Sequence, residues 1–307
     1  MNDRERRRRR KRNQRIKMFA MCFLCCLVLI CFLTVLLVMR KLPHKENKSV
    51  IAQEEDLMTE NLQGTEELTE MIRTDDTKAT EEVLSEVMKA ENEYQRILSV
   101  SPGERAVSGF LSKEIAVRLF YEGDITRVLP RIQGISYQEN PNVALSDLAY
   151  LRMLYYGMDG NTYVGEMIVN QKIKEEVLSV FQKLYEERYP IERMVLVDEY
   201  QGEDERSMDA NNTSAFNYRT IAGSSKLSNH SYGMAIDLNP KYNPYVKQRG
   251  DGSILCQPES GRAYADRTKE FDYKIDENDL AYQLFTQAGF TWGGSWNSVK
   301  DYQHFEK

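Results

Sequence analysis

Histidine and cysteine, the residues that most often bind metals or form disulfides, are scarce in this 307-residue chain: it has three histidines and five cysteines. Four of the cysteines lie within residues 18–39, which leaves only Cys256 for the rest of the chain. An internal disulfide and a cysteine-rich zinc module outside residues 18–39 are therefore excluded. The chain also lacks a G-x-G-x-x-G sequence and a Walker-type phosphate loop, so nothing supports nucleotide binding.

Positive charge is concentrated at one end of the chain. Residues 1–17 contain ten Lys or Arg side chains and two acidic ones, whereas residues 18–307 contain 31 basic and 45 acidic side chains. The net charge of -6 for the whole chain hides this asymmetry. Nucleic-acid binding needs a basic surface, so the acidic main part of the chain predicts no nucleic-acid partner.

Charged residues are absent from residues 18–39, which read MFAMCFLCCLVLICFLTVLLVM. About 20 apolar residues in a helix span the hydrocarbon core of a bilayer, and the preceding basic run predicts that residues 1–17 stay in the cytoplasm. A cleaved signal peptide is the alternative, but its apolar region is typically about 7–15 residues long and ends at a small-x-small site, which is missing here. We therefore predict a single-pass cell-membrane protein with a transmembrane helix at 18–39 and its C-terminal part outside the cell.

Residues 40–100 offer little from which a core could form. They are rich in Glu and Thr, and Tyr94 is the only aromatic residue from 42 to 100. So few apolar side chains cannot offset the entropy lost on ordering the chain. Val83, Val87 and Ile97 do follow a helical spacing, which predicts a helix near 80–98. We predict an acidic stalk, helical or disordered, between the membrane and the folded part.

Beyond Ser101-Pro102-Gly103 the pattern becomes that of a folded protein, with a predicted N-terminal extension at 101–154 and a domain at 155–307. Hydrophobic periodicity predicts helices at 146–157, 172–190 and 277–289. It predicts strands at 162–169, 191–200, 214–221 and 233–240 and a final strand near 301–306, with a polar loop at 201–214. Short strands with a few helices indicate an α+β fold, a small antiparallel sheet with flanking helices.

Two histidines lie close in sequence to carboxylates. His230 stands seven residues before Asp237, and His304 stands three residues after Asp301. Catalytic zinc commonly takes three His or carboxylate ligands and keeps a fourth position open, so His230, Asp237 and His304 are candidate ligands. Hydrolysis also needs a base for the attacking water and a cation or donor for the oxyanion, roles open to Asp301 and Arg219. Each residue also has a structural interpretation, such as a turn cap or a surface ion pair, and spacing alone does not decide.

The segment S-x-H-x-x-G-x-A-x-D resembles the first zinc motif of the D-Ala-D-Ala carboxypeptidase (VanY-like) metallopeptidases, and it stands here as Ser228, His230, Gly233, Ala235 and Asp237. That family also includes L-alanyl-D-glutamate endopeptidases that cut peptidoglycan peptides. Asp301-Tyr-Gln-His304 resembles its second motif, and the W-G-G-x-W run at 292–296 resembles its endopeptidase branch. The resemblance covers residues 155–307.

The resemblance implies a zinc metallopeptidase domain with the small α+β fold shared with the hedgehog signalling domain. It implies zinc ligands at His230, Asp237 and His304 and a general base or acid at Asp301. It places Arg219 near the scissile carbonyl and Ser228 against the substrate. Two aromatic residues that we expect to wall the cleft are Tyr232 and Trp296, although core packing is the alternative for the tryptophan.

The function predicted from these features is zinc-dependent hydrolysis of peptidoglycan stem peptides at the outer face of the membrane. D-alanyl-D-alanine carboxypeptidase activity is the main prediction, and L-alanyl-D-glutamate endopeptidase activity is the alternative within the family. A non-catalytic zinc-bearing module that binds the cell wall is a third hypothesis, but such a module would more readily have lost Asp301. A carboxypeptidase needs a cation for the terminal carboxylate, and the sequence does not show whether Arg219 reaches one.

Overall fold

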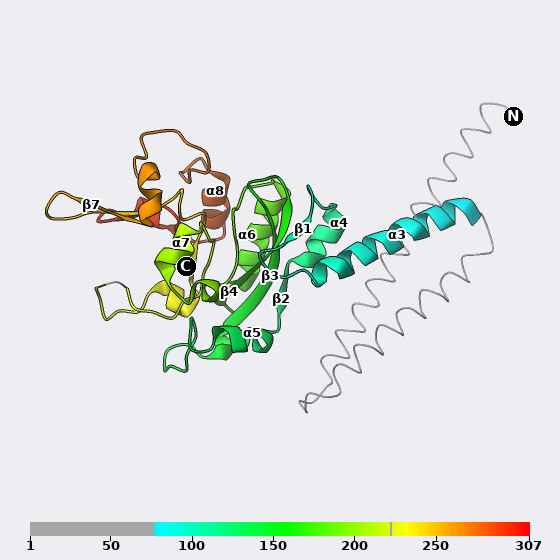
Figure 1. The fold of residues 1–307 in the computed structure, drawn as a ribbon, viewed down its shortest axis with the longest axis horizontal. Helices are drawn as coiled ribbons and strands as arrows, with labels where there is room; N and C mark the ends of the chain where they lie inside the picture. The colour runs from blue at the N-terminus through cyan, green and yellow to red at the C-terminus, as the bar shows by residue number, and fades with distance from the viewer. Residues whose placement is uncertain (1–76, 222) are drawn as a thin grey trace. The chain divides into compact units, whose positions relative to one another are not determined.

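The computed structural model describes residues 77–221 and 223–307 (Figure 1). The chain divides into two units, Met1–Thr80 and Glu81–Lys307. The predicted cytoplasmic tail at 1–17, the predicted transmembrane helix at 18–39 and most of the predicted stalk lie outside the described residues. A search of the described residues found no helix with the length and hydrophobicity needed to cross a membrane.

An antiparallel sheet of four strands is the largest element of the second unit (Figure 1). Its strands run in the order β1 (Arg105–Val107), β4 (Thr162–Asn170), β3 (Leu148–Tyr156) and β2 (Tyr121–Gly123). The two long strands form a hairpin in unbroken register, from Leu148 opposite Asn170 to Tyr156 opposite Thr162. The strand predicted at 162–169 and the α+β fold class are thereby confirmed.

The helix predicted over 146–157 is wrong, because this segment forms the inner strand β3. Alternate residues such as Leu151 and Met153 enter one hydrophobic cluster, while Leu148 and Tyr150 enter another on the opposite face. A strand buried on both faces has a nearly continuous apolar sequence. Periodicity alone cannot distinguish such a run from a buried helix. The boundary predicted between residues 154 and 155 falls inside this strand.

Helix α6 (Lys174–Glu186) covers one face of the sheet and buries Val177, Phe181 and Leu184 against it. Helix α8 (Leu280–Gln287) joins the same core, with the rings of Phe181 and Phe285 edge to face at 6.0 Å. The helices predicted at 172–190 and 277–289 are therefore confirmed with shorter bounds. This core continues into the C-terminal strands through Ile236 and Phe305.

The helix predicted near 80–98 is confirmed as α3 (Thr77–Leu98). Its last turns pack through Tyr94 and Ile97 into a cluster that includes Leu154 and Val164 of the sheet. The remaining short helices before the sheet hairpin are α4 (Lys113–Ala116), η1 (Val117–Leu119), α5 (Ile125–Ile132) and η2 (Leu145–Asp147).

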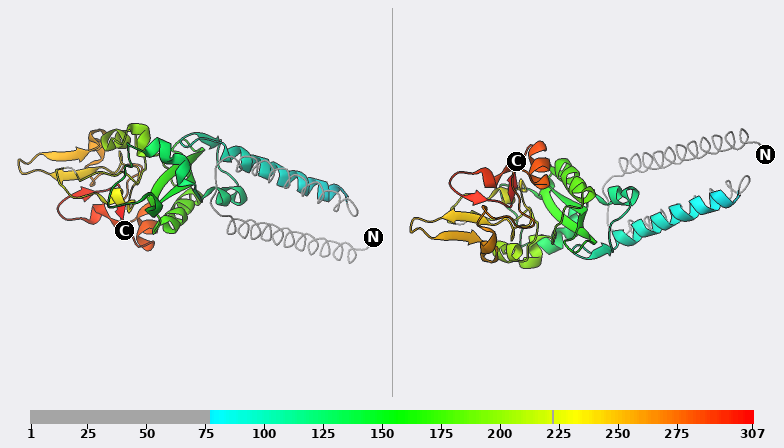
Figure 2. Two further views of the ribbon diagram at one scale, coloured as in Figure 1. Left: turned by 90° about the horizontal axis from the view of Figure 1, so that it is seen from below. Right: turned by 90° about the horizontal axis from the view of Figure 1, so that it is seen from above.

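Two three-stranded antiparallel sheets follow in the C-terminal part. One has the order β5 (Ala235–Asp237), β10 (His304–Glu306), β8 (Thr291–Trp292). The other has the order β7 (Ile254–Gln257), β6 (Tyr245–Gln248), β9 (Lys300–Asp301), and its gold hairpin of β6 and β7 projects from the unit in both views of Figure 2. The other short helices are η3 (Val197–Tyr200), α7 (Asp204–Asp209), η4 (Asn229–Tyr232), η5 (Glu259–Tyr264) and η6 (Gly293–Ser295).

Strand predictions in this part have mixed outcomes. The strands predicted at 233–240 and near 301–306 are confirmed as the short strands β5, β9 and β10. The strand predicted at 191–200 is wrong. There the side chain of Asn212 occupies the place of a neighbouring strand: its Oδ1 accepts from the Val195 N–H at 2.9 Å and its Nδ2 donates to the Val195 carbonyl at 3.0 Å.

The segment 214–221 is also not a regular strand. Its backbone N–H groups bond in turn to different parts of the chain: Ser214 to Asp237, Phe216 to Ile168 and Asn217 to His230. No single partner strand runs beside it, so isolated bridges replace a ladder. The loop predicted at 201–214 contains the short helix α7.

Candidate metal centre

His230 lies in the short turn η4, whose two ends are set by Ser228 and Gly233. The Ser228 Oγ accepts a hydrogen bond from the His230 N–H at 3.3 Å, as an N-cap serine does. Gly233 closes the turn with φ of 65°, and a Cβ at this position would lie 2.6 Å from the backbone nitrogen of Asn170. The turn therefore packs directly on β4, and His230 is only 5% exposed.

Asp237 and His304 stand directly opposite each other on β5 and β10. Opposite residues of an antiparallel pair place their side chains on the same face of the sheet, with Cβ atoms about 5 Å apart. Strand pairing thus brings together two residues that are 67 positions apart, with Asp237 Oδ1 3.0 Å from His304 Nδ1. The backbone of Asp237 also exchanges two hydrogen bonds with Ser214, which holds this ligand from its other side.

The three candidate ligands bring their donor atoms close together, with one ligand atom of each within 4.8 Å of the other two. His230 Nε2 lies 3.2 Å from His304 Nδ1 and 3.3 Å from Asp237 Oδ2. In a tetrahedral zinc site with bonds of about 2.0–2.2 Å, neighbouring ligand atoms are about 3.3–3.6 Å apart. His230 faces one carboxylate oxygen of Asp237 and His304 faces the other, so with either oxygen as the ligand atom the three side chains could supply three of the four ligands of one zinc ion.

The second ring nitrogen of each histidine has its own acceptor. His230 Nδ1 lies 2.6 Å from the carbonyl oxygen of Ala215, and His304 Nε2 lies 3.0 Å from a carboxylate oxygen of Glu306. Glu306 is in turn held by the side-chain amide of Asn229, which donates to it at 2.6 Å. Such outer partners fix which nitrogen carries the proton, so His230 would bind a metal through Nε2 and His304 through Nδ1.

Opposite charges dominate the cluster. Burial raises the pKa of Asp237, but the charges and hydrogen bonds of His230 and His304 outweigh it and hold the pKa well below its usual range. Burial lowers the pKa of His304, but its hydrogen bonds to Asp237 and Glu306 outweigh that effect and raise the pKa to about 10. A carboxylate is thus kept ionised at the centre of the cluster, and without a metal His304 is held as a cation.

Asp301 lies beside this cluster, although its carboxylate is not one of the three grouped ligands. It sits on β9, where it pairs with Tyr245 of β6. Burial raises the pKa of Asp301 to about 6, while the charge of His304 opposes the rise and that of Asp237 adds to it. A general base works best with a pKa near the operating pH, and the role of Asp301 as that base stays a prediction.

Glycines of the W-G-G-x-W run explain how the chain reaches this arrangement. A Cβ on Gly293 would lie 2.6 Å from the carbonyl oxygen of Asp301 and 3.2 Å from the Cβ of His304. A Cβ on Gly294 would lie 2.2 Å from the ring of Trp292. The turn η6 can therefore lie flat against the strands of Asp301 and His304 only because these two positions carry no side chain.

Sequence reasoning missed Glu306, Gln303 and the carbonyl of Ala215. Glu306 was open to detection, because residues two apart on a strand face the same side and Glu306 follows His304 by two. Gln303 donates through Nε2 to Asp301 Oδ1 at 3.2 Å, a contact that depends on the backbone path between the two residues. A backbone carbonyl such as that of Ala215 leaves no signal in a sequence.

The predicted substrate-contacting residues lie at different places around the cluster. Trp296 is half-buried, with its ring centroid 5.2 Å from that of His304. The Ser228 hydroxyl is engaged in capping η4, and the half-buried Tyr232 packs against the cluster of Tyr150 and Phe216. Contact of these three residues with a substrate stays a prediction.

Arg219 lies next to the metal-binding turn, with its side chain committed elsewhere. Its N–H donates to the Ser231 Oγ at 2.9 Å, and its carbonyl accepts from the same hydroxyl at 2.6 Å. Its guanidinium forms an ion pair with Asp204 at the start of α7, and Asp204 also accepts from the Asn217 amide at 2.7 Å. The charge of Arg219 is therefore matched by a carboxylate in this structure.

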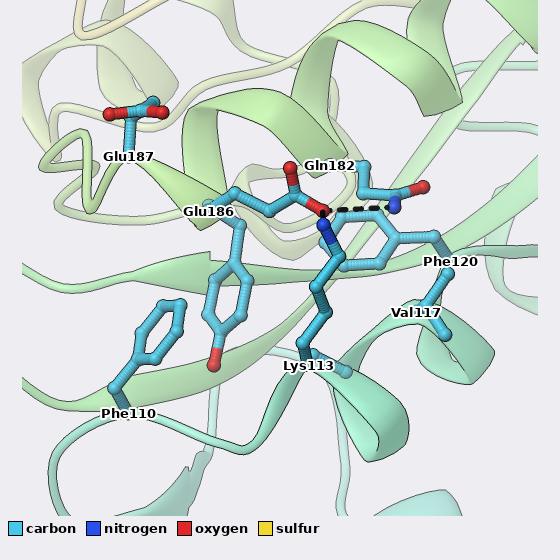
Figure 3. Close-up of a pocket in the computed structure, with 9 residues that line it drawn as sticks. Phe110, Lys113, Val117, Phe120, Gln182, Glu186 and Glu187 are labelled. Atoms are coloured by element: carbon cyan, nitrogen blue, oxygen red, sulfur yellow. Dashed lines mark hydrogen bonds and ion pairs between the residues drawn. The ribbon is translucent and has the colours of Figure 1, made fainter. Parts of the chain in front are cut away.

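A pocket of about 280 Å³ lies between α4 and α6, and none of the candidate site residues lines it (Figure 3). Its floor is aromatic, with the rings of Phe110 and Tyr185 stacked at 4.5 Å. The Lys113 ammonium lies 3.3 Å from the Glu186 carboxylate at its side. Its remaining lining residues are Ala116, Val117, Phe120, Gln182 and Glu187. The candidate metal centre therefore does not lie in this pocket, and the arrangement of its three ligand side chains identifies it.

Comparison with known proteins gives one match. Residues 222–307 match the model of a protein family described as D-alanyl-D-alanine carboxypeptidase. No curated protein and no solved structure matched the chain. The matched residues contain His230, Asp237, His304 and Asp301, whereas Arg219 precedes them. Residues 222–307 are thus similar to the D-alanyl-D-alanine carboxypeptidase family.

Proposed function

We propose that the chain is a zinc-dependent peptidase that hydrolyses peptidoglycan stem peptides, with D-alanyl-D-alanine carboxypeptidase activity as its first candidate reaction. One observation carries the proposal: one ligand atom from each of His230, Asp237 and His304 lies within 4.8 Å of the other two, and the Asp301 carboxylate lies beside them without joining them. A structural zinc site is normally closed by four protein ligands, whereas a catalytic site keeps one position open.

The zinc ligands and Asp301 have separate roles in the proposed hydrolysis. Zinc held by His230, Asp237 and His304 would lower the pKa of a bound water toward about 7 and polarise the scissile carbonyl. Asp301 accepts the proton of the attacking water and afterwards returns a proton to the leaving amine. We also propose that the ring of Trp296, which lies 5.2 Å from that of His304, contacts the bound peptide.

Endopeptidase cleavage between L-Ala and D-Glu is the second candidate, and the ion pair of Arg219 favours it. A carboxypeptidase must stabilise the free carboxylate of its substrate, which calls for a cation with unmatched charge. The guanidinium of Arg219 already faces Asp204. An internal peptide bond makes no such demand. A wall-binding module without turnover is disfavoured, since the carboxylate of Asp301 would then have no task.

The bond cleaved can be identified from the products. The zinc-loaded, full-length protein is incubated in detergent with muropeptides that carry complete pentapeptide stems. The products are then identified by mass spectrometry. Loss of the terminal D-Ala supports the carboxypeptidase, and separation of L-Ala from D-Glu supports the endopeptidase. Asp301→Asn, which keeps the shape of the side chain, is expected to lower kcat by about 10²–10⁴-fold.

Two controls make the assay decisive. A chelator should abolish cleavage, and re-addition of zinc should restore it. If a protein that holds one zinc per chain releases neither product, the proposed peptidase is ruled out. The proposed location, with residues 18–39 in the membrane and the metal centre outside the cell, is tested separately by protease digestion of intact cells, which should remove the C-terminal part and spare the tail.

A further inference from the structure

Gln303 is a buried amide in direct contact with the carboxylate of Asp301. It is only 2% exposed, and its Nε2 donates to Asp301 Oδ1 at 3.2 Å. The opposite orientation of the amide would place its oxygen against a carboxylate oxygen, two acceptors in contact, so the nitrogen faces Asp301. Within the described residues Asp301 has no other side-chain hydrogen bond, which leaves its Oδ2 available to the attacking water.

The amide is itself held firmly in place. The carbonyl of Gln303 accepts from the Leu238 N–H at 3.0 Å, so its backbone is fixed to the residue that follows the ligand Asp237. Its Nε2 also contacts the Met208 sulfur of α7 at 3.5 Å. On the backbone side of Asp301, Gly293 packs so closely that a Cβ would lie 2.8 Å from the Asp301 Cβ. Asp301 is therefore confined between η6 and the Gln303 amide.

Stability alone does not explain an amide at this position. The Oε1 of Gln303 is buried and has no hydrogen-bond partner among the described residues. An unpaired buried acceptor lowers stability, whereas an apolar side chain of the same length would carry no such penalty. Groups that break a packing rule in this way tend to be retained for function, and within the part of the chain that the structure describes this amide donates to one carboxylate, that of Asp301.

We propose that Gln303 is a positioning residue, which binds Asp301 Oδ1 so that Oδ2 is presented to the attacking water. The inference rests on the proposed peptidase function, since it assigns a device to the base of that reaction. Gln303 touches neither the grouped ligand atoms nor the reacting atoms. Its loss should therefore slow the chemical step without weakening the binding of zinc or peptide.

The test compares two variants of the zinc-loaded, full-length protein. Gln303→Met keeps the length of the side chain and removes the amide, and Met208→Leu is the matched control, because it removes the other contact of the same amide and spares the donor. A hydrogen bond to a charged group contributes about 1.5–3 kcal/mol, which corresponds to a fall in kcat of about 10–150-fold for Gln303→Met. KM and zinc affinity should stay within about threefold of wild type, and Met208→Leu should keep wild-type kcat.

A second readout does not depend on turnover. In crystals of the zinc-loaded proteins, the Asp301 carboxylate should occupy one orientation in wild type and lose it in Gln303→Met. Wild-type kcat in Gln303→Met, or a loss of activity that parallels a loss of zinc, would overturn the proposal. If wild type cleaves no peptide, the proposed function fails, and an unchanged Asp301 carboxylate in the Gln303→Met crystals would then refute the positioning role by itself.

Discussion

At the scale of single residues, His304 shows how the site keeps its charge in balance. Its Nδ1 faces Asp237 and its Nε2 faces Glu306, both at 3.0 Å. Two carboxylate acceptors stabilise the doubly protonated ring, which agrees with a pKa raised to about 10 after the opposing effect of burial. Zinc can bind Nδ1 only after the proton there has left, so metal and proton compete for the same atom.

This competition predicts that zinc affinity rises with pH. Between about pH 6.5 and 8.5 the ring of His304 is protonated in the metal-free protein and deprotonated in the zinc form, so the apparent affinity should rise about tenfold per pH unit. Titration with zinc against a competing chelator at three pH values measures the slope. Calorimetry in buffers of different ionisation enthalpy should count about one released proton. An affinity that does not change over this range would contradict the assignment.

The metal-free protein should show the opposite trend in stability. The folded pKa of His304 lies above the value of about 6.5 expected in the unfolded chain. Its ion pair therefore contributes stability that is fully present below about pH 6.5 and is lost as the pH rises through about 10. Zinc thus replaces the proton as the group that holds the three ligands together.

At the scale of elements, the turn η4 depends on one glycine. Gly233 has φ of 65°, and an added Cβ would lie 2.6 Å from the Asn170 nitrogen and 2.9 Å from the Val169 carbonyl carbon. Both contacts are with backbone atoms of β4, which cannot move without disturbing the central hairpin. The S-x-H-x-x-G-x-A-x-D segment therefore carries a glycine for packing as much as for backbone conformation.

Gly233→Ala is accordingly expected to destabilise the metal-free protein by about 2–4 kcal/mol, from backbone strain together with the steric clash. Gly223→Ala is the matched control, because Gly223 also has a positive φ, of 75°, but has no atom within 4 Å of an added Cβ. Its cost should be only about 1 kcal/mol. Urea denaturation of both variants measures the difference, and equal losses would show that the contact with β4 does not matter.

The helices that were predicted correctly from the sequence each have one exposed face. In α6 and α8 the buried positions recur on one face of the helix, so their period is visible. β3 failed because both of its faces are buried, and the segment 191–200 failed because Asn212 bonds to Val195 in place of a strand. The hydrogen bonds of a side chain such as Asn212 and the burial of a strand on both faces depend on distant parts of the chain. Local periodicity in the sequence therefore cannot reveal either of them.

At the scale of the whole molecule, the hairpin of β3 and β4 and the C-terminal strands together position the three candidate ligands. β4 supports the turn of His230, and the pairing of β5 with β10 joins Asp237 to His304. The grouping of His230, Asp237 and His304 could be predicted because their flanking residues resemble a family motif. The outer partners could not, since Ala215 acts through its backbone and Gln303 through a contact that only the fold creates. The Arg219 side chain pairs with Asp204 on α7, which no local pattern indicated.

The proposed peptidase requires that His230, Asp237 and His304 bind one zinc ion and that Asp301 stays free beside it. The most direct test is X-ray diffraction from crystals of the zinc-loaded protein at the zinc absorption edge. One anomalous peak is predicted about 2.0–2.2 Å from His230 Nε2, His304 Nδ1 and a carboxylate oxygen of Asp237. A peak at other side chains, or one in which Asp301 is a direct ligand or His304 binds through Nε2, would contradict the account.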